Sequence, residues 1–154
     1  MLPRTYENQV CSVARALEVL GDRWTLLVLR DAFSRVRRFE DFQRSLGVAR
    51  NVLTDRLNRL VDEGILRRVP YQERPVRFEY RLTDKGRDLY PVLIALMQWG
   101  DRYTAGEAGP PVELIHEPCG QHTQPRLVCD HCGEPIDPRD MRPQPGPGLL
   151  AAAK

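Results

Sequence analysis

The sequence lacks any apolar run near the ~20 residues that a membrane-spanning helix requires. Its first residues, Met-Leu-Pro-Arg-Thr-Tyr-Glu-Asn, contain no apolar stretch followed by small residues at a cleavage site, so no export signal is expected. Lysine is scarce, because Lys85 and Lys154 are the only two. We therefore expect a cytoplasmic protein with no membrane partner, whose positive charge is carried by arginine.

The residue patterns of common enzyme sites are also missing. We find no catalytic dyad, no glycine-rich phosphate loop and no metal site with an open position. The 154 residues suffice for one compact domain and a small appendage. A hydrophobic content of 42% supplies a core, and a charged content of 29% keeps it soluble. These absences predict a protein that is not an enzyme.

Charge is unevenly distributed along the chain. Residues 1–106 carry 19 basic and 14 acidic side chains, a net charge of +5, whereas residues 107–154 carry 4 and 7, a net charge of −3. Between Ser34 and Arg81, 12 arginines face 7 acidic residues. Such a local positive field attracts a phosphate backbone. A generally arginine-rich composition gives the same count, so charge alone leaves nucleic-acid binding open.

Apolar spacing predicts four helices in the first half of the chain. A short helix over residues 13–20 ends at Gly21, and residues 23–33 form a helix at the centre of the core. Phe39, Phe42 and Leu46 mark a two-turn helix closed by Gly47. A longer helix runs to Gly64 and carries an apolar face of Leu53, Leu57, Leu60 and Val61. The last two helices, joined by a tight turn, predict a helix-turn-helix.

The opposite face of the longer helix is polar. Side chains able to reach base edges or phosphates lie on this face and on its flank near the N-terminus: Arg50, Asn51, Thr54, Asp55 and Asn58. We take these five as candidate DNA-binding residues. An ordinary solvated helix face has the same pattern, so the helix alone does not decide between the two interpretations.

A β-hairpin is predicted directly after this helix. Residues 76–82 alternate apolar and charged side chains at the strand period of two, and residues 65–69 supply the partner strand. The connection over residues 70–75 is rich in turn-forming residues. With the helix in the major groove, such a wing lies against neighbouring phosphates or reaches the minor groove. Arg74 and Arg77 are the candidate wing residues.

A long helix is predicted after Thr83, which can cap its start. Its apolar stripe consists of Leu89, Leu93, Leu96, Met97 and Gly100, and Trp99 and Tyr103 form an i, i+4 pair. Pro91 is expected to kink it. The stripe either packs against its own domain or joins two copies. We favour a homodimer, because operators usually pair two reading heads one helical turn apart.

A second chemical site is predicted beyond Gly106. His116 and Cys119 form an H-x2-C pair, and Cys129 and Cys132 form a C-x2-C pair, each followed by glycine. Such pairs fit tight knuckles, and the four residues complete a closed tetrahedral set for structural zinc. His122 and His131 are reserve ligands. The alternative is thiol-disulfide chemistry at Cys129 and Cys132. The proline-rich residues 142–154 are expected to lack ordered structure.

Seven short motifs, in order, resemble those of the HxlR-type regulators over roughly residues 9–104. They are Cys11-Ser-Val-Ala, Leu20-Gly-Asp-Arg-Trp24, Arg38-Phe-Glu-Asp-Phe42, Leu53-Thr-Asp-Arg-Leu57, Glu63-Gly-Ile-Leu66, Glu79-Tyr-Arg-Leu-Thr83 and Gly86. The resemblance implies a bacterial or archaeal winged-helix transcription factor, dimeric through its terminal helices, that binds a near-palindromic operator. Some members sense oxidants or electrophiles through a cysteine near the N-terminus, and Cys11 occupies that place. Cys11 can equally be a small buried hydrophobe.

These observations combine into one prediction. The fold class is mainly α (α+β), a winged helix-turn-helix with a long C-terminal dimerisation helix and a small zinc-ribbon-like tail. The expected domains are residues 1–106, 107–141 and 142–154, with the last disordered. The expected function is a homodimeric DNA-binding regulator that represses by occluding an operator. An interaction adaptor that has lost DNA binding and a CxxC oxidoreductase remain as alternatives.

Overall fold

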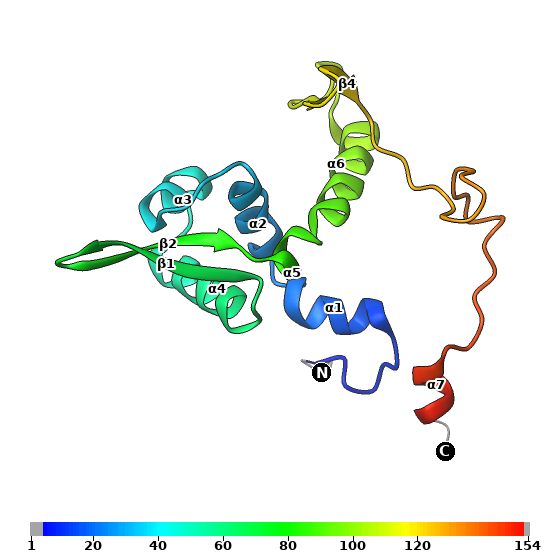
Figure 1. Cartoon of the computed structure of the whole chain (residues 1–154), viewed down its shortest axis with the longest axis horizontal. Helices are drawn as coiled ribbons and strands as arrows, with labels where there is room; N and C mark the ends of the chain where they lie inside the picture. Colours follow the sequence, from blue (N-terminus) through cyan, green and yellow to red (C-terminus); the bar gives the residue numbers. More distant parts are fainter. Residues whose placement is uncertain (1–4, 153–154) are drawn as a thin grey trace. The chain divides into compact units, whose positions relative to one another are not determined.

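The computed structural model describes residues 5–152 of the chain. Its fold is mainly helical with two small antiparallel sheets, as the sequence predicts (Figure 1). The chain divides into two compact units at the boundary between Leu93 and Ile94. No helix within residues 5–152 has both the length and the apolar character needed to cross a membrane.

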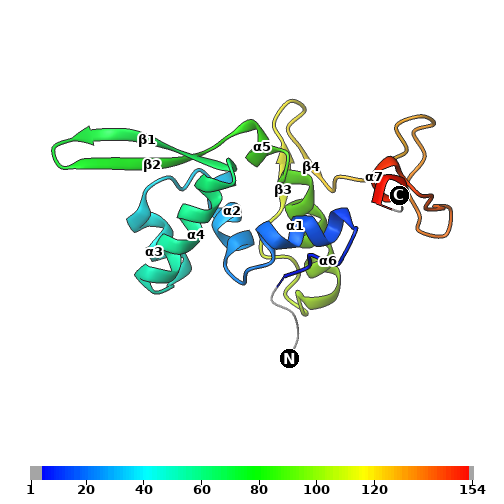
Figure 2. The same ribbon diagram turned by 90° about the horizontal axis from the view of Figure 1, so that it is seen from below.

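The first unit contains the predicted helix-turn-helix and hairpin. Its elements are α1 (Ser12–Leu20), α2 (Thr25–Phe33), α3 (Phe39–Leu46), α4 (Arg50–Asp62), β1 (Leu66–Glu73), β2 (Val76–Leu82), α5 (Asp84–Arg87) and the start of α6 (Tyr90–Thr104). The β1–β2 hairpin runs past the ends of the helices as a long arm (Figures 1 and 2). A winged helix-turn-helix architecture is therefore present.

The core of this unit forms where α2, α3 and α4 meet. Its side chains with relative exposure below 3% are Val28, Leu29, Phe42, Leu53, Leu57, Leu60, Ile65 and Leu66. Burial of each such side chain contributes about 1.5–3 kcal/mol. The predicted central helix is confirmed, since Val28 and Leu29 of α2 have no exposed surface. The three leucines of α4 fix that helix by one face and leave the other free.

Two local devices set the ends of these helices. Gly47 adopts a left-handed backbone (φ 62°), and its N–H donates to Gln43 O at 2.9 Å, which ends α3. This conformation favours glycine. Thr83 caps a helix as predicted, because its hydroxyl oxygen accepts from Gly86 N–H at 3.1 Å, but that helix is the short α5 and not the predicted long helix. The same hydroxyl donates to Gly64 O at 2.6 Å, which ties α5 to the turn after α4.

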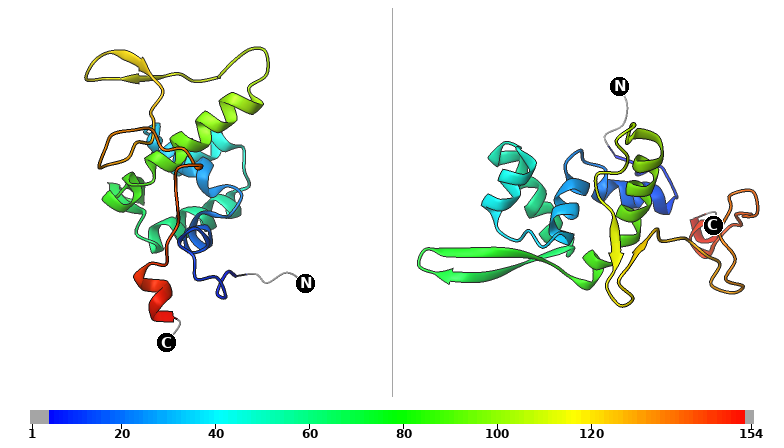
Figure 3. Two further views of the ribbon diagram at one scale, coloured as in Figure 1. Left: turned by 90° about the vertical axis from the view of Figure 1, so that its right-hand side faces the viewer. Right: turned by 90° about the horizontal axis from the view of Figure 1, so that it is seen from above.

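The hairpin, which we call the wing, also makes backbone contacts with the segment that precedes α3. β1 and β2 pair from Leu66 with Leu82 to Glu73 with Val76, and the register shifts between Pro70 and Gln72. Arg38 forms an isolated bridge with Glu79, and Tyr80 N–H donates to Arg37 O at 2.7 Å. The residues before α3 therefore hold the middle of the wing beside the helices (Figure 3, right).

The predicted long helix differs from the structure in two respects. Pro91 does not kink it, because the chain breaks before it into α5 and α6, and Pro91 lies in the first turn of α6. A proline costs nothing there, since its missing N–H would have no helical partner. The predicted apolar stripe is also divided, because Leu89 and Leu93 pack against the core of the first unit.

A different stripe of α6 is exposed. Val92, Leu96, Trp99 and Tyr103 recur at helical spacing with relative exposures of 44%, 49%, 61% and 65%. The Trp99 and Tyr103 rings lie 5.5 Å apart, as the predicted pair requires. At about 100° per residue the four side chains share one face of the helix. This unpartnered face, which we call the α6 stripe, is a surface that a second copy could cover.

The second unit continues from α6 into short elements. β3 (Leu114–His116) pairs antiparallel with β4 (Gln121–Thr123), and Gln98 of α6 donates to Pro125 O at 2.8 Å. A six-residue helix, α7 (Pro147–Ala152), lies in the segment that the sequence predicts to be disordered, and none of its residues is buried. Leucine and alanine favour helix locally, even without a packing partner.

Candidate nucleic-acid interface

The five candidate residues of α4 gather on its exposed face. Arg50, Asn51, Thr54, Asp55 and Asn58 together line one shallow, open hollow. Arg50, Asn51, Thr54 and Asp55 are exposed, and Asn58 is half-buried. Their position results from the burial of Leu53, Leu57 and Leu60 on the other side of the helix. The sequence prediction of which face is free agrees with the structure.

Two of these side chains are held at the start of α4. The Arg50 guanidinium stacks 4.6 Å from the centre of the Phe39 ring of α3, a cation–π contact across the turn. The Thr54 hydroxyl donates to Arg50 O at 2.8 Å, which leaves its lone pairs available. The N-terminus of a recognition helix is the part that usually contacts base edges. Arg50 is thus oriented before any ligand arrives.

Asp55 brings a negative charge to the same face. Its carboxylate accepts from Arg56 at 2.9 Å, and the side chain is 71% exposed. A carboxylate repels phosphate but accepts a hydrogen bond from the amino group of cytosine. Among the five residues, Asp55 is therefore suited to contact a base edge and unsuited to contact the phosphate backbone of DNA.

Asn58 connects α4 to the wing. Its side-chain oxygen accepts a hydrogen bond from Arg68 of β1, and Arg68 also lies 6.0 Å from the centre of the Tyr80 ring. Sequence reasoning did not select Arg68, although the Arg67-Arg68 pair places basic charge in a predicted strand. The amide nitrogen of Asn58 makes no hydrogen bond to another described residue and can still donate. Recognition helix and wing thus share one polar contact.

The predicted wing residues lie at the far end of the hairpin. Arg74 follows β1 in the turn, Arg77 of β2 pairs with Gln72, and both are exposed. Arg38, also missed from the sequence, lies 4.4 Å from the centre of the Tyr71 ring and 3.8 Å from the carboxylate of Glu79. The wing therefore presents arginines at its tip and is contacted by another, Arg38, along its middle.

Two further arginines of α4 contact Asp22, which lies outside the candidate interface. Arg56 forms an ion pair with Asp22 at 2.8 Å, and Arg59 lies 3.6 Å from the same carboxylate. Arg59 also donates to Glu18 O in α1. These contacts fasten the recognition helix to α1 and to the connection that follows it. Their role is positioning.

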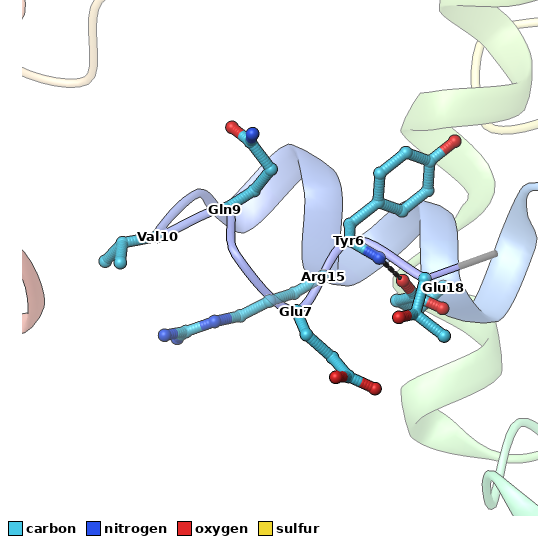
Figure 4. Close-up of a pocket in the computed structure, with 7 residues that line it drawn as sticks. Tyr6, Glu7, Gln9, Val10, Arg15 and Glu18 are labelled. Carbon is cyan, nitrogen blue, oxygen red and sulfur yellow. Dashed lines mark hydrogen bonds between the residues drawn. The ribbon is translucent and has the colours of Figure 1, made fainter. Parts of the chain in front are cut away.

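Cys11, the candidate sensor, lies at the N-cap of α1 and is exposed. Backbone N–H groups of Ala14 and Val13 at the start of the helix lower the pKa of its thiol, and the Arg15 guanidinium lowers it further. The preceding segment folds back along α1, where Tyr6 N–H donates to the Glu18 carboxylate beside a shallow hollow (Figure 4). The alternative of a buried, inert cysteine disagrees with this exposure.

The candidate zinc ligands form two separate pairs. His116 Nδ1 lies 3.2 Å from Cys119 Sγ. Hydrogen bonds from the backbone N–H groups of Cys132 and His131, and from the Cys132 side chain, lower the pKa of the Cys129 thiol. In the part of the chain that the structure describes, no three histidine, cysteine or acidic side chains are grouped to hold a metal. The pairs are thus formed individually and are not brought together.

The reserve ligands are placed less favourably. His122 lies in β4, and its Nδ1 is 3.3 Å from the Glu113 carboxylate. His131 lies inside the turn between Cys129 and Cys132 and is exposed. The residues at the ends of that turn are therefore the better candidates.

Comparison with known proteins finds relatives that match most of this chain. A family model described as HxlR-like helix-turn-helix matches residues 19–108. The HTH-type transcriptional regulator Rv3095 of Mycobacterium tuberculosis is 54% identical over 140 residues, 91% of this chain and 89% of that protein. Since 106 residues precede Glu107, at least 34 aligned residues lie beyond Gly106. The similarity therefore continues into the segment that carries the candidate zinc ligands.

Solved structures similar to this chain are also described as transcription factors or regulators. PA1607, described as a proposed transcription factor, has 42% identity and a TM-score of 0.78, with 88% of this chain and 94% of that one covered. The reduced form of the redox regulator HypR has 29% identity and a TM-score of 0.58, with 62% of this chain and 95% of that one covered. These relatives are described as regulators, and none of those named here is an enzyme. They do not favour the adaptor interpretation.

Proposed function

The chain belongs to the HxlR-like helix-turn-helix family of DNA-binding transcriptional regulators, and we propose that it represses transcription as a homodimer on a near-palindromic operator. In this proposal α4 enters the major groove and the wing follows the neighbouring backbone. Each protomer reads one half-site, and the bound dimer excludes the transcription machinery. The site of action is the bacterial cytoplasm, where chromosomal DNA lies.

The observation that carries this proposal is the exposed face at the start of α4. The hollow lined by Arg50, Asn51, Thr54, Asp55 and Asn58 combines donors and acceptors that can read base edges. Arg74 and Arg77 supply the exposed positive charge that a phosphate backbone requires beside such a helix. We assign base contacts to Asn51 and Asp55 and phosphate contacts to Arg74 and Arg77.

The α6 stripe supports the homodimer. Four large apolar side chains with exposures between 44% and 65% lie on one face of the helix. A single soluble protein rarely exposes an aligned apolar face of this kind without a partner. On α1, Val13 and Leu17 are also exposed, at 67% and 43%. Self-association through α6 and through α1 would cover these surfaces.

The DNA interface is tested by two single substitutions. Asn51→Ala is expected to weaken binding to a selected operator by about 1–3 kcal/mol, or roughly 5- to 150-fold, with little effect on random DNA. Arg77→Ala is expected to weaken both and to reduce the slope of log affinity against log salt by about one per protomer. The operator is first selected from random duplexes with the full chain, and affinities are measured by fluorescence anisotropy.

Arg139→Ala is the matched control for the charge change, because Arg139 is paired with Asp137 at 2.7 Å and lies outside α3, α4 and the wing. It should leave both affinities unchanged. If no saturable binding to any duplex is found at low salt, the DNA-binding proposal fails. If Arg139→Ala weakens binding as much as Arg77→Ala, net charge and not the wing determines affinity.

A response through Cys11 is the second candidate function. The reduced and oxidised forms of HypR show that a related fold serves a redox regulator. Cys11 is exposed at the start of α1, and helix N–H groups favour its thiolate. We propose that alkylation or oxidation of this thiolate shifts α1 and thereby changes the affinity for the operator.

Because the pKa of Cys11 is lowered, its thiolate fraction at a given pH exceeds that of an ordinary thiol. The alkylation rate of Cys11 by iodoacetamide should therefore reach half its maximum at a lower pH than the rate of the same cysteine in a peptide of residues 5–20. Peptide mass spectrometry after brief labelling measures both. An equal midpoint for the protein and the peptide, or unchanged operator binding after complete Cys11 modification, would refute the sensor role.

A further inference from the structure

Two turns in the segment after α6 repeat the same backbone geometry. In the first, the Gly120 N–H donates to His116 O at 2.8 Å, and Gly120 has φ 68°. In the second, the Gly133 N–H donates to Cys129 O at 2.8 Å, and Gly133 has φ 77°. Each turn thus carries a candidate ligand at its first position, a cysteine three residues later, and a left-handed glycine that reverses the chain.

Each turn also sits at the tip of a hairpin. The first joins β3 to β4, where His116 pairs with Gln121. The second is flanked by a bridge between Val128 and Pro135, with Cys129 N–H donating to Glu134 O at 2.8 Å. In the first turn the two donor atoms, His116 Nδ1 and Cys119 Sγ, lie 3.2 Å apart. Two equivalent half-sites result, one with an imidazole and a thiol, the other with two thiols.

We propose that the two turns bind one Zn²⁺ ion through His116, Cys119, Cys129 and Cys132. Three thiolates and one imidazole satisfy the tetrahedral preference of zinc and leave no open position, so the ion is structural. Nine residues separate Cys119 from Cys129, and the ion closes this loop by bringing the turns together. The site goes beyond the proposed DNA-binding function and does not depend on it.

The exposed apolar side chains around the two turns also indicate that the turns come together. Ile115, Leu127, Val128 and Ile136 have relative exposures of 53%, 68%, 49% and 42%. Hairpins with strands of three residues cannot bury enough surface to be stable alone. A metal that joins the two turns replaces the missing core, because its binding free energy becomes folding free energy.

Dithiol chemistry at Cys129 and Cys132 explains less. A disulfide there would use one turn and leave the matching geometry of His116 and Cys119 without a role. A Cys3His zinc site uses both turns and all four donors. The two possibilities differ in metal content and in the oxidation state of Cys129 and Cys132, which can be measured on the full chain.

The test begins with the full-length chain purified under reducing conditions without chelator. Elemental analysis and native mass spectrometry should find about one zinc per chain, and Co²⁺ in its place should give the intense visible and thiolate charge-transfer bands of a tetrahedral site. Cys119→Ser and Cys132→Ser should each lower the zinc affinity at least about 100-fold, since loss of outer-shell partners alone costs 10- to 100-fold.

His131→Asn and His122→Asn are the matched controls, because each removes a nearby imidazole outside the ligand set. Both should retain about one zinc per chain and the cobalt spectrum. A reduced wild-type chain that takes up neither Zn²⁺ nor Co²⁺ overturns the proposal, as does retention of the ion by Cys119→Ser. If a ligand variant fails to fold, the wild-type cobalt spectrum alone decides. DNA binding of the zinc-free chain is a separate readout that leaves this test unaffected.

Discussion

Leu96→Asp is expected to convert the proposed homodimer into a monomer and to weaken operator binding about 100-fold or more, because linked reading heads gain roughly 10²- to 10⁴-fold from their effective concentration. The reason lies in the α6 stripe, where Leu96 is half-exposed between Val92 and Trp99. A carboxylate in a covered apolar interface loses its hydration without gaining a partner. Light scattering after size exclusion measures the mass, and fluorescence anisotropy measures the affinity.

Thr104→Asp adds the same charge to the same helix at an exposed position about 110° away from the centre of the stripe. This control should remain dimeric and bind the operator normally. A wild-type chain that is monomeric at micromolar concentration contradicts the role of the stripe. So does a dimer that survives Leu96→Asp with its affinity unchanged.

Gly86→Ala is expected to lower the free energy of unfolding of the first unit by about 2–3 kcal/mol, the usual cost of forcing a buried methyl group into occupied space. An added Cβ would lie 2.2 Å from Ile65 O and 3.0 Å from Leu82 Cδ2. The Ile65 carbonyl cannot easily retreat, since it accepts from Thr83 N–H at 3.0 Å. Urea unfolding followed by tryptophan fluorescence gives the difference.

The helical glycine Gly100 provides the matched comparison. Its added Cβ would meet only Thr104 Oγ1, at 3.7 Å, which is ordinary van der Waals contact. Gly100→Ala should therefore leave stability unchanged or raise it by up to about 1 kcal/mol through helix propensity. Equal stability of Gly86→Ala and the wild type would show that α5 does not pack against the base of the wing as described.

The sequence predicted the first unit well because residue spacing within each element determines which face of that element is buried. The spacing of Leu53, Leu57 and Leu60 fixed the buried face of α4 and hence the exposed face that carries Asn51. Strand alternation after Ile65 predicted the wing, and the cap at Thr83 is formed as expected. In each case the physical cause acts within a few residues, so one sequence is enough to find it.

The sequence did not predict the features that depend on contacts between elements far apart along the chain. The pattern of apolar residues over the predicted long helix did not reveal that Leu89 and Leu93 face the core while Val92 and Trp99 do not. The contact between Arg68 and Asn58 joins a strand to a helix, and no spacing rule specifies such a pair. Zinc binding stays a prediction, because a shared ion depends on two turns that only the ion brings together.

The ion pairs between α4 and the end of α1 have a mechanical consequence. Arg56 and Arg59 both reach Asp22, and Arg59 also donates to Glu18 O, so α1 and the recognition helix are fastened at neighbouring points. Rotation of α1 must either break these charged contacts or carry α4 with it. In the proposed homodimer, a rotation of α1 would therefore alter the distance between the two recognition helices without any contact to the duplex.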